Sequence, residues 1–136
     1  MNAFVDTNVL VYAADETMPS SPKTRIAREI LLLPDLHLSV QVLSEFVVNA
    51  RHPQKLGFTP SQEADWIERW LRFPIAPLTE KTFVAALEIH QRFQLSHWDS
   101  LILACARELK CTQLYTQALN DGQDYGGVVA HNPFAQ

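Results

Sequence analysis

The sequence predicts a single α/β domain in which a parallel sheet is covered by helices on both faces. Two observations favour this fold. Short apolar stretches alternate with longer segments of helical periodicity, which is the order typical of parallel sheets. Prolines, serines and glycines separate most of these stretches, and no internal repeat interrupts the alternation. With 136 residues, the chain is long enough for one hydrophobic core and too short for two, so one domain over 1–136 is expected.

The first half of the chain is expected to begin with two strands and three helices. The strands cover residues 2–6 and 36–39, and the helices cover residues 7–14, 23–33 and 40–51. The helix over 23–33 carries apolar residues at helical spacing, and Pro34 is expected to end it. The helix over 40–51 has one apolar face, and Pro53 lies just beyond its end.

The rest of the chain is expected to form three more helices and three short strands. Thr59 is a capping residue, Pro60 suits the first helical position and Gln62 completes a capping-box pattern, so a helix begins there. The two later helices cover residues 79–93 and 96–109, and the strands cover 74–77, 113–116 and 127–130.

The composition is that of an ordinary globular protein, with 47% hydrophobic and 19% charged residues. No apolar run approaches the roughly 20 residues that a membrane span needs, and no signal peptide is apparent. The spacing of Cys105 and Cys111 does not indicate zinc, so both are expected to be reduced thiols, with Cys105 in the core. We therefore expect a cytoplasmic protein that does not associate with membranes.

The net charge of −4 at first argues against a nucleic-acid partner, because basic patches normally supply the affinity for phosphates. A group of carboxylates that holds divalent cations reverses this expectation, since the metal ion itself meets the phosphate. The charge therefore excludes neither RNA nor DNA. The chain has no glycine-rich phosphate loop, because three of its four glycines lie within 122–127.

Two acidic residues of the first half are candidates for chemistry, and each has a structural alternative. Asp6 ends the first strand, where sites in parallel sheets lie, but aspartate is also a favoured helix N-cap. Glu45 belongs to a polar stripe on the helix over 40–51, which borders a cleft or simply faces solvent. The stripe consists of Gln41, Glu45, Asn49 and His52.

Two acidic residues of the second half are also candidates. Asp99 follows Ser96 by three residues, so it lies in the first turn of a helix that Ser96 caps. Asp121 lies in an Asn-Asp-Gly turn sequence, for which a purely structural role is the simpler interpretation. If such acids converge, their oxygens suit Mg²⁺ or Mn²⁺, and two ions ~3.5–4 Å apart can promote phosphodiester cleavage. The histidines show no zinc-binding pair, and no Gly-x-Ser-x-Gly motif supports a serine nucleophile.

Three short motifs, in order, resemble those of PIN domains. The segment Phe4-Val5-Asp6-Thr7-Asn8-Val9-Leu10 is similar to the opening of that family, and Leu43-Ser44-Glu45-Phe46 and His97-Trp98-Asp99-Ser100-Leu101-Ile102 resemble its second and third acidic motifs. The last part of the chain is similar to one branch of VapC-type toxins. It carries Leu114-Tyr115-Thr116, Asp121-Gly122-Gln123 and His131-Asn132-Pro133-Phe134.

This resemblance implies a three-layer α/β/α sandwich with a central, mainly parallel sheet of four to five short strands. It also implies a Mg²⁺- or Mn²⁺-dependent endoribonuclease that acts as the toxin of a toxin–antitoxin pair, with an RNA substrate, a cognate antitoxin and a homodimeric state. Carried over by position, Asp6, Glu45 and Asp99 are the metal-binding and catalytic acids, and Asn8 and Thr116 are supporting polar groups.

One position departs from the resemblance, because relatives of this branch commonly carry an acid where this chain has Ala118. Asp121 is a candidate to act as the fourth catalytic acid, a triad is a second possibility, and a weakened or inactive relative is a third. Three alternatives to the ribonuclease therefore stay open: an RNA- or protein-binding module of the same fold, a metal-dependent enzyme of another class such as a small phosphatase, and a structural protein without a site.

A cluster of large apolar residues in the second half has two interpretations. Trp66, Ile67, Trp70, Leu71 and Phe73 lie within one short stretch. Core packing is the simpler interpretation, since aromatic side chains contribute much buried area. The functional interpretation is a groove for an amphipathic antitoxin helix, which requires that the tryptophans are not both buried in one protomer.

Overall fold

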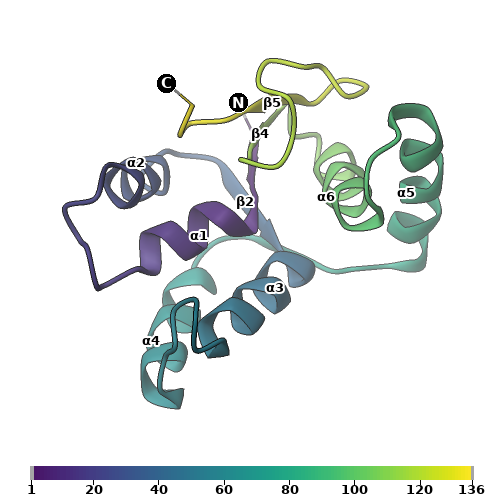
Figure 1. The fold of residues 1–136 in the computed structure, drawn as a ribbon. Coiled ribbons are helices and arrows are strands. Elements are labelled where there is room, and N and C mark those ends of the chain that lie inside the picture. Colours follow the sequence, from purple (N-terminus) through teal and green to yellow (C-terminus); the bar gives the residue numbers. More distant parts are fainter. Residues whose placement is uncertain (1, 136) are drawn as a thin grey trace.

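The protein is described here by a computed structural model, which covers residues 2–135. A five-stranded sheet lies at its centre, all of its strand pairs are parallel, and its order is β3-β2-β1-β4-β5 (Figure 1). The strands are β1 (Ala3–Val5), β2 (Leu36–Ser39), β3 (Ile75–Ala76), β4 (Gln113–Tyr115) and β5 (Val129–His131). The helices are α1 (Thr7–Ala14), α2 (Pro22–Ile30), α3 (Val40–Arg51), α4 (Pro60–Trp70), α5 (Glu80–Phe93) and α6 (His97–Glu108).

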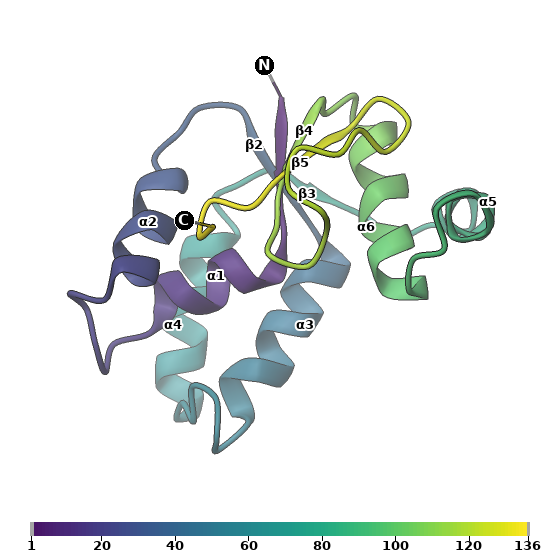
Figure 2. The same ribbon diagram turned by 45° about the horizontal axis from the view of Figure 1, so that its top comes forward.

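The helices form two layers around this sheet. Helices α1 to α4 pack together on one side, and α5 and α6 lie on the other, as Figures 1 and 2 show. The predicted three-layer α/β/α sandwich is confirmed, with a fully parallel sheet of five strands.

The strand order creates a switch point between β1 and β4. From β1 the chain adds β2 and then β3 on one side, and it returns through α5 and α6 to add β4 and β5 on the other. The backbone N–H of Asp6 continues the β1–β4 pairing by donating to the carbonyl of Tyr115, at 3.0 Å. Crevices at such switch points, outside the carboxyl ends of the strands, are where parallel sheets bind ligands.

The core explains why the central elements are rigid. Every residue of β1 is buried, and so is the run from Ser100 to Ala106 in α6. Helix α6 is buried on nearly all sides because α5 covers the face that it turns away from the sheet. A buried hydroxyl joins the two helices, since Thr82 Oγ1 donates to Glu108 Oε2 at 2.8 Å. The first turn of α6, which carries Asp99, is therefore placed by a fixed scaffold.

Two element boundaries differ from the predictions. Helix α2 ends at Ile30 and not near Pro34. The N–H groups of residues 32 and 33 bond to carbonyls three residues back instead of four, which forms a turn, and Asp35 then adopts a positive φ of 62° before β2 begins. The last strand covers Val129–His131 and not 127–130, because Gly127, at a φ of 104°, still belongs to the preceding turn. The other predicted elements agree with the structure to within a few residues at each end.

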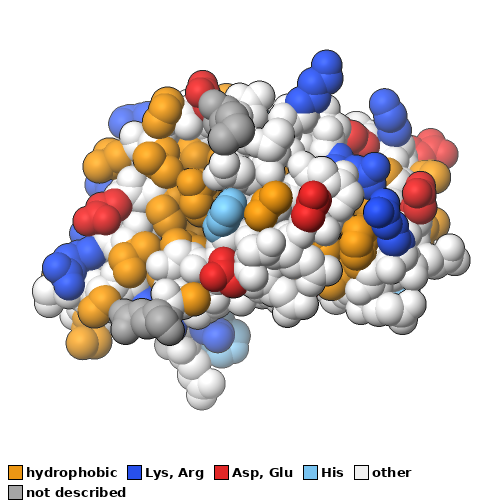
Figure 3. Space-filling view, turned by 90° about the horizontal axis from the view of Figure 1, so that it is seen from above, with side chains coloured by type: hydrophobic (Ala, Val, Ile, Leu, Met, Phe, Trp, Pro, Cys, Tyr) orange, Lys and Arg blue, Asp and Glu red, His pale blue; other side chains and the backbone are white. Residues whose placement is uncertain are grey.

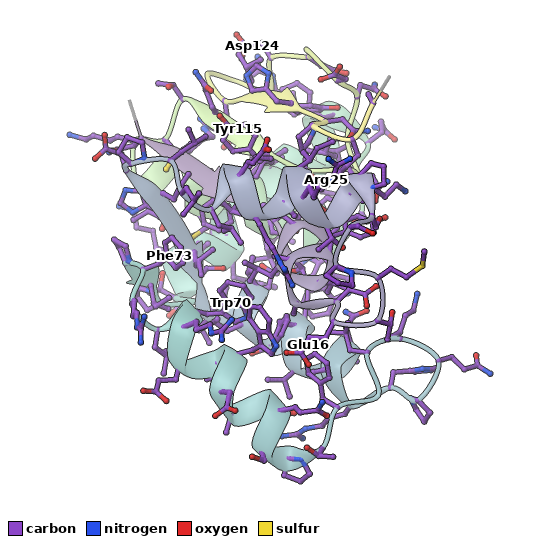
Figure 4. All side chains as sticks on the ribbon, turned by 90° about the vertical axis from the view of Figure 1, so that its left-hand side faces the viewer. Glu16, Arg25, Trp70, Phe73, Tyr115 and Asp124 are labelled. Carbon is purple, nitrogen blue, oxygen red and sulfur yellow. The ribbon has the colours of Figure 1, made fainter. Side chains whose placement is uncertain are left out.

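The tryptophans of α4 are core residues, which confirms the simpler interpretation of this stretch and counts against an antitoxin groove formed by them. Trp66 and Trp70 are only 7% and 3% exposed, and their rings stack with centroids 5.3 Å apart. Trp70 also meets Phe46 of α3 edge to face, at 5.6 Å. Figure 4 shows Trp70 at the end of α4 that joins the rest of the domain. The aromatic side chains of this stretch therefore pack α4 against α3.

Cys105 and Cys111 are both free thiols and both buried. Within residues 2–135, no helix is long and apolar enough to span a bilayer.

Candidate functional site

A cleft of about 1020 Å³ lies at the carboxyl ends of the central strands, between α1, α3 and the first turn of α6. Asp6, Glu45 and Asp99 all line it, so the structure brings these three predicted residues together from separate parts of the chain. Asn8 lines the same cleft, and the buried Thr116 reaches it through Asp6. Of the predicted polar stripe on α3, Gln41, Glu45 and Asn49 line the cleft. His52 instead caps the end of that helix.

Asp6 is the most tightly held of the three acids. Its side chain is buried, and both carboxylate oxygens accept hydrogen bonds. Oδ1 accepts from the backbone N–H of Thr7 at 2.7 Å, and Oδ2 accepts from Thr116 Oγ1 at 2.7 Å. The Thr116 oxygen accepts in turn from the backbone N–H of Ala118, at 3.0 Å. Asp6 is thus both the N-cap of α1 and a wall of the cleft, and the two interpretations of its position are compatible.

Glu45 is positioned by a residue that the motif analysis did not single out. Thr7 Oγ1 donates to Glu45 Oε2 at 2.7 Å, so this one residue holds Asp6 through its backbone N–H and Glu45 through its hydroxyl. Glu45 is half-buried on α3, and its backbone carbonyl accepts from Asn49 Nδ2 at 2.9 Å. The position of Glu45 follows from the helix that begins directly after β2, where Ser39 Oγ accepts from the N–H of Val42.

Asp99 lies in the first turn of α6, as predicted. Ser96 is the N-cap, and its Oγ accepts from the backbone N–H of Asp99 at 3.1 Å. The side chain of Asp99 is half-buried and lines the cleft. The buried Gln41 fixes the same turn, since its Nε2 donates to the carbonyl of Trp98 at 3.0 Å.

The electrostatics of the cleft disfavour further negative charge. Burial raises the pKa of Asp6 from 3.8 to about 6, the hydrogen bonds from Thr116 and Thr7 oppose this rise, and the nearby charges of Glu45 and Asp99 add to it. Burial likewise raises the pKa of Asp99, against a hydrogen bond from Ser96. The charges of Glu45 and Asp99 therefore both disfavour ionisation of Asp6.

The donor set of the cleft suits a hard divalent cation. Four carboxylates line it, those of Asp6, Asp15, Glu45 and Asp99, against one ammonium, that of Lys55. Among the described residues, Asn8 Oδ1 is a buried acceptor with no hydrogen-bond partner, as expected where an ion or water completes a site. Oxygen ligands with excess negative charge are the set that Mg²⁺ and Mn²⁺ prefer.

The acids do not form a preassembled cage. Within residues 2–135, no group of three or more His, Cys, Asp and Glu side chains is arranged so that it could hold a metal ion as it stands. The three acids share a cleft, but an ion bound by all of them requires side-chain movement. Glu45, which is half-buried and held through one oxygen, has more freedom to move than Asp6.

The structure does not bring Asp121 to this cleft. Its side chain is exposed, and Oδ1 accepts from the backbone N–H of Asn132 at 2.9 Å, so it joins the loop after β4 to the end of the chain. Ala118, in contrast, lines the cleft. The position at which an acid was expected thus faces the site, while the candidate replacement is engaged elsewhere.

Three polar residues of the cleft were missed as functional candidates. Thr7 lies inside the first motif, but only the fold shows that its hydroxyl reaches Glu45. Tyr12 donates to Gln117 Oε1 at 2.8 Å across the mouth of the cleft, between segments that are 105 residues apart. No periodicity or spacing connects Tyr12 and Gln117, because their contact depends on the pairing of β1 with β4.

Comparisons with known proteins identify the family. Residues 3–117 match the PIN domain family, which covers most of the chain and all three acidic motifs. No curated protein is a significant match to the sequence.

Several solved structures share the fold over nearly the whole chain. A toxin–antitoxin complex from Klebsiella pneumoniae is 23% identical with a TM-score of 0.69, and the match covers 98% of each chain. VapC20 from Mycobacterium tuberculosis, a toxin that cleaves the sarcin–ricin loop, is 17% identical with a TM-score of 0.69, over 88% of this chain and 90% of its own. VapBC2 from Rickettsia felis, bound to a DNA fragment from its promoter, is 19% identical with a TM-score of 0.65, over 97% of this chain and 98% of its own.

Proposed function

This chain belongs to the PIN domain family, and we propose that it is a divalent-metal-dependent endoribonuclease that acts as the toxin of a toxin–antitoxin pair. The observation that carries the proposal is the convergence of Asp6, Glu45 and Asp99 on one cleft at the switch point of the sheet. A structural protein would not need to place three acids around one cleft, where the charges of Glu45 and Asp99 disfavour ionisation of Asp6.

The three acids would hold Mg²⁺ or Mn²⁺, with Asn8 as a neighbouring acceptor. When bound, such an ion supplies the positive charge that activates a water and stabilises the leaving oxygen of a phosphodiester. The chain itself orients the site: Thr7 and Thr116 fix the two oxygens of Asp6, and Thr7 also fixes Glu45. With four carboxylates against one lysine, the cleft repels a phosphate until a cation offsets its charge.

Cleavage of RNA tests this proposal directly. An end-labelled single-stranded RNA is incubated with the protein in Mg²⁺ or Mn²⁺, beside a small phosphate monoester and an equivalent DNA strand. We expect internal cuts in the RNA that EDTA abolishes and that Asp6→Asn and Glu45→Gln reduce by about 100-fold or more. Asp65→Asn, at an exposed position on α4, is the matched control and retains full activity.

Two results would contradict the proposal. Hydrolysis of the phosphate ester without RNA cleavage would favour a small phosphatase. Binding of RNA without cleavage, in either metal, would favour a binding module of the same fold.

The alanine at position 118 favours a ribonuclease whose RNA cleavage is weaker than that of a site with a fourth acid. Without an acid at this place in the cleft, less negative charge is available to hold a second ion. We expect cleavage to require high Mg²⁺ or to prefer Mn²⁺, and Ala118→Asp to raise both RNA cleavage and toxicity on expression. Because Asp121 bonds to Asn132 away from the cleft, Asp121→Asn is expected to change little in either background. Full activity of the unaltered protein at low Mg²⁺ would show that three acids suffice.

The proposed partner is a cognate antitoxin. Support comes from the similar structures, of which the Klebsiella protein is described as part of a toxin–antitoxin complex. Exposed apolar side chains also lie at both ends of α2, those of Met18, Leu32 and Leu33. Figure 3 views the molecule from above and shows hydrophobic side chains gathered on its left, the side on which α2 lies in Figure 1. A short neighbouring reading frame whose product copurifies with this chain and inhibits cleavage would support the pair, and cleavage unaffected by that product would oppose it.

A second copy of this chain is the other proposed partner. Helix α5 packs mainly on α6, and it leaves three large apolar side chains exposed, those of Phe83, Val84 and Leu87. Neighbouring exposed apolar side chains of this kind favour an interface with another protein surface. Sedimentation equilibrium is expected to give the mass of a dimer, and a monomer at micromolar concentration would contradict it.

A further inference from the structure

Trp98 differs from the other two tryptophans of the chain. It is 57% exposed, whereas Trp66 and Trp70 are buried in the core. Trp98 precedes Asp99 in the first turn of α6, and it lines the same cleft as the three acids. The largest aromatic side chain is therefore presented to solvent at the site where the proposed reaction takes place.

The scaffold holds this turn in a fixed orientation. Buried Gln41 donates to the carbonyl of Trp98 at 3.0 Å. The rings of His97 and Trp98 meet edge to face, with centroids 5.3 Å apart, and the Phe83 ring meets that of His97 in the same way at 5.7 Å. A large ring that is supported on one side and exposed on the other is suited to stack against a flat ligand.

The surroundings of Trp98 select the kind of ligand. The exposed side chains of Val40 and Leu78 line the same cleft, so the cleft offers an apolar surface as well as its carboxylates. An apolar protein surface laid over Trp98 would also desolvate the neighbouring carboxylate of Asp99, which is unfavourable. A nucleotide avoids this cost, because its base covers the aromatic ring while its phosphate stays with the cation at the acids.

We propose that Trp98 stacks on an unpaired base of the RNA, next to the phosphate that is cleaved. This inference rests on the proposed ribonuclease function and deepens it. A base within a duplex has both of its faces covered by its neighbours, so the site takes a single-stranded segment or a loop. Stacking of this kind tolerates any base, because every base has a π-face.

Binding of two matched RNA probes tests the inference. One probe is a fluorescein-labelled octaadenosine RNA, and the other is the same sugar–phosphate chain without bases. Both are titrated in Ca²⁺, with gels to confirm that the strands stay intact. We expect the unaltered protein to bind the octaadenosine about ten-fold more tightly than the abasic chain. Trp98→Ala and Trp98→Leu lose this preference, and Trp98→Phe keeps most of it. Leu71→Ala, at the exposed C-cap of α4 outside the cleft, is the control and behaves as the unaltered protein.

Tryptophan fluorescence supplies an independent readout. Trp66 and Trp70 are shielded from the solvent, so quenching by octaadenosine is expected in the unaltered protein and is lost in Trp98→Phe. An equal base preference in Trp98→Ala, together with normal RNA cleavage, would overturn the role of Trp98 while leaving the ribonuclease proposal intact. If Trp98→Ala changed the sedimentation of the protein but kept its base preference, Trp98 would belong to a protein interface and the stacking role would be overturned. Failure of the unaltered protein to bind or cleave RNA would overturn both proposals.

Discussion

Asp6 shows how one residue serves the local fold and the site together. Its carboxylate caps α1 and at the same time faces the cleft, where burial and two neighbouring acids raise its pKa to about 6. Thr7 and Thr116 reduce this rise with hydrogen bonds. Without a bound cation, the charged form of Asp6 therefore lowers the stability of the folded protein.

The pH dependence of stability follows from the raised pKa of Asp6. Between its unfolded value of 3.8 and about 6, the folded protein holds a proton that the unfolded chain has released. The contribution of Asp6 thus favours folding at acid pH and is lost as the pH rises through 6. In EDTA, Asp6→Asn, which keeps a capping side chain, is expected to gain roughly 2 kcal/mol more unfolding free energy at about pH 8 than at about pH 4.5. Denaturant titrations measure this, and an equal effect at both pH values would contradict it.

The same reasoning applies to Asp99. Burial raises its pKa, so its charge is unfavourable at neutral pH without metal, while the Ser96 cap binds the backbone and survives substitution. We expect Asp99→Asn to raise the melting temperature in EDTA and to abolish RNA cleavage. Asp65→Asn on exposed α4 should change neither. A clear loss of stability in Asp99→Asn would instead make Asp99 a structural capping residue.

At the residue scale, the sequence motifs indicated Asp6, Glu45 and Asp99, which the structure places on one cleft, but they did not reveal the residues that hold these acids. The hydroxyl of Thr7 reaches Glu45 only because α1 and α3 pack together. Trp98 was part of a motif, yet its exposure is a property of the tertiary structure.

At the scale of elements, local signals placed most helices well and their ends less well. Helix α3 matches its predicted range, and the capping box of Thr59 and Gln62 forms as the sequence indicated. The end of α2 was misplaced, because the chain leaves the helix through a turn and a positive φ at Asp35, neither of which proline spacing reveals.

The packing of α4 on α3 gives a prediction at this scale. Trp70 is buried against Phe46 and Trp66, so Trp70→Ala is expected to lower the free energy of unfolding by about 3–5 kcal/mol. Leu71→Ala, at the C-cap of the same helix, where the side chain is exposed, should cost less than about 0.5 kcal/mol. Denaturant unfolding measures both values. Similar small costs for the two substitutions would show that the tryptophan cluster does not hold this helix in solution.

At the scale of the whole molecule, the site depends on the strand order. Asp6 and Thr116 are separated by 110 residues, and they meet because β4 pairs with β1. The alternation of strands and helices predicted a parallel sheet, but no local pattern contains the order of its strands. The convergence of the acids could be expected from the family resemblance alone, and it follows physically from the switch point between β1 and β4.

The net charge of −4 is also best understood at this scale. Four carboxylates line the cleft against one lysine, so a bound cation would offset the charge of the cleft and attract the phosphate of the proposed RNA substrate. The acids are close enough to shift the pKa of Asp6, yet no three of the described side chains are arranged to hold an ion without movement. Metal binding is therefore expected to reorganise the site.

The position of bound Mn²⁺ tests the central claim most directly. Crystals of the protein grown or soaked with Mn²⁺ near neutral pH are measured for anomalous scattering. We expect one strong peak in the cleft, with oxygens of Asp6, Glu45 and Asp99 each within ~2.0–2.6 Å of the ion. A map with no peak in the cleft, or with a peak from which any of the three carboxylates is turned away, would contradict the assignment of these acids as one metal site.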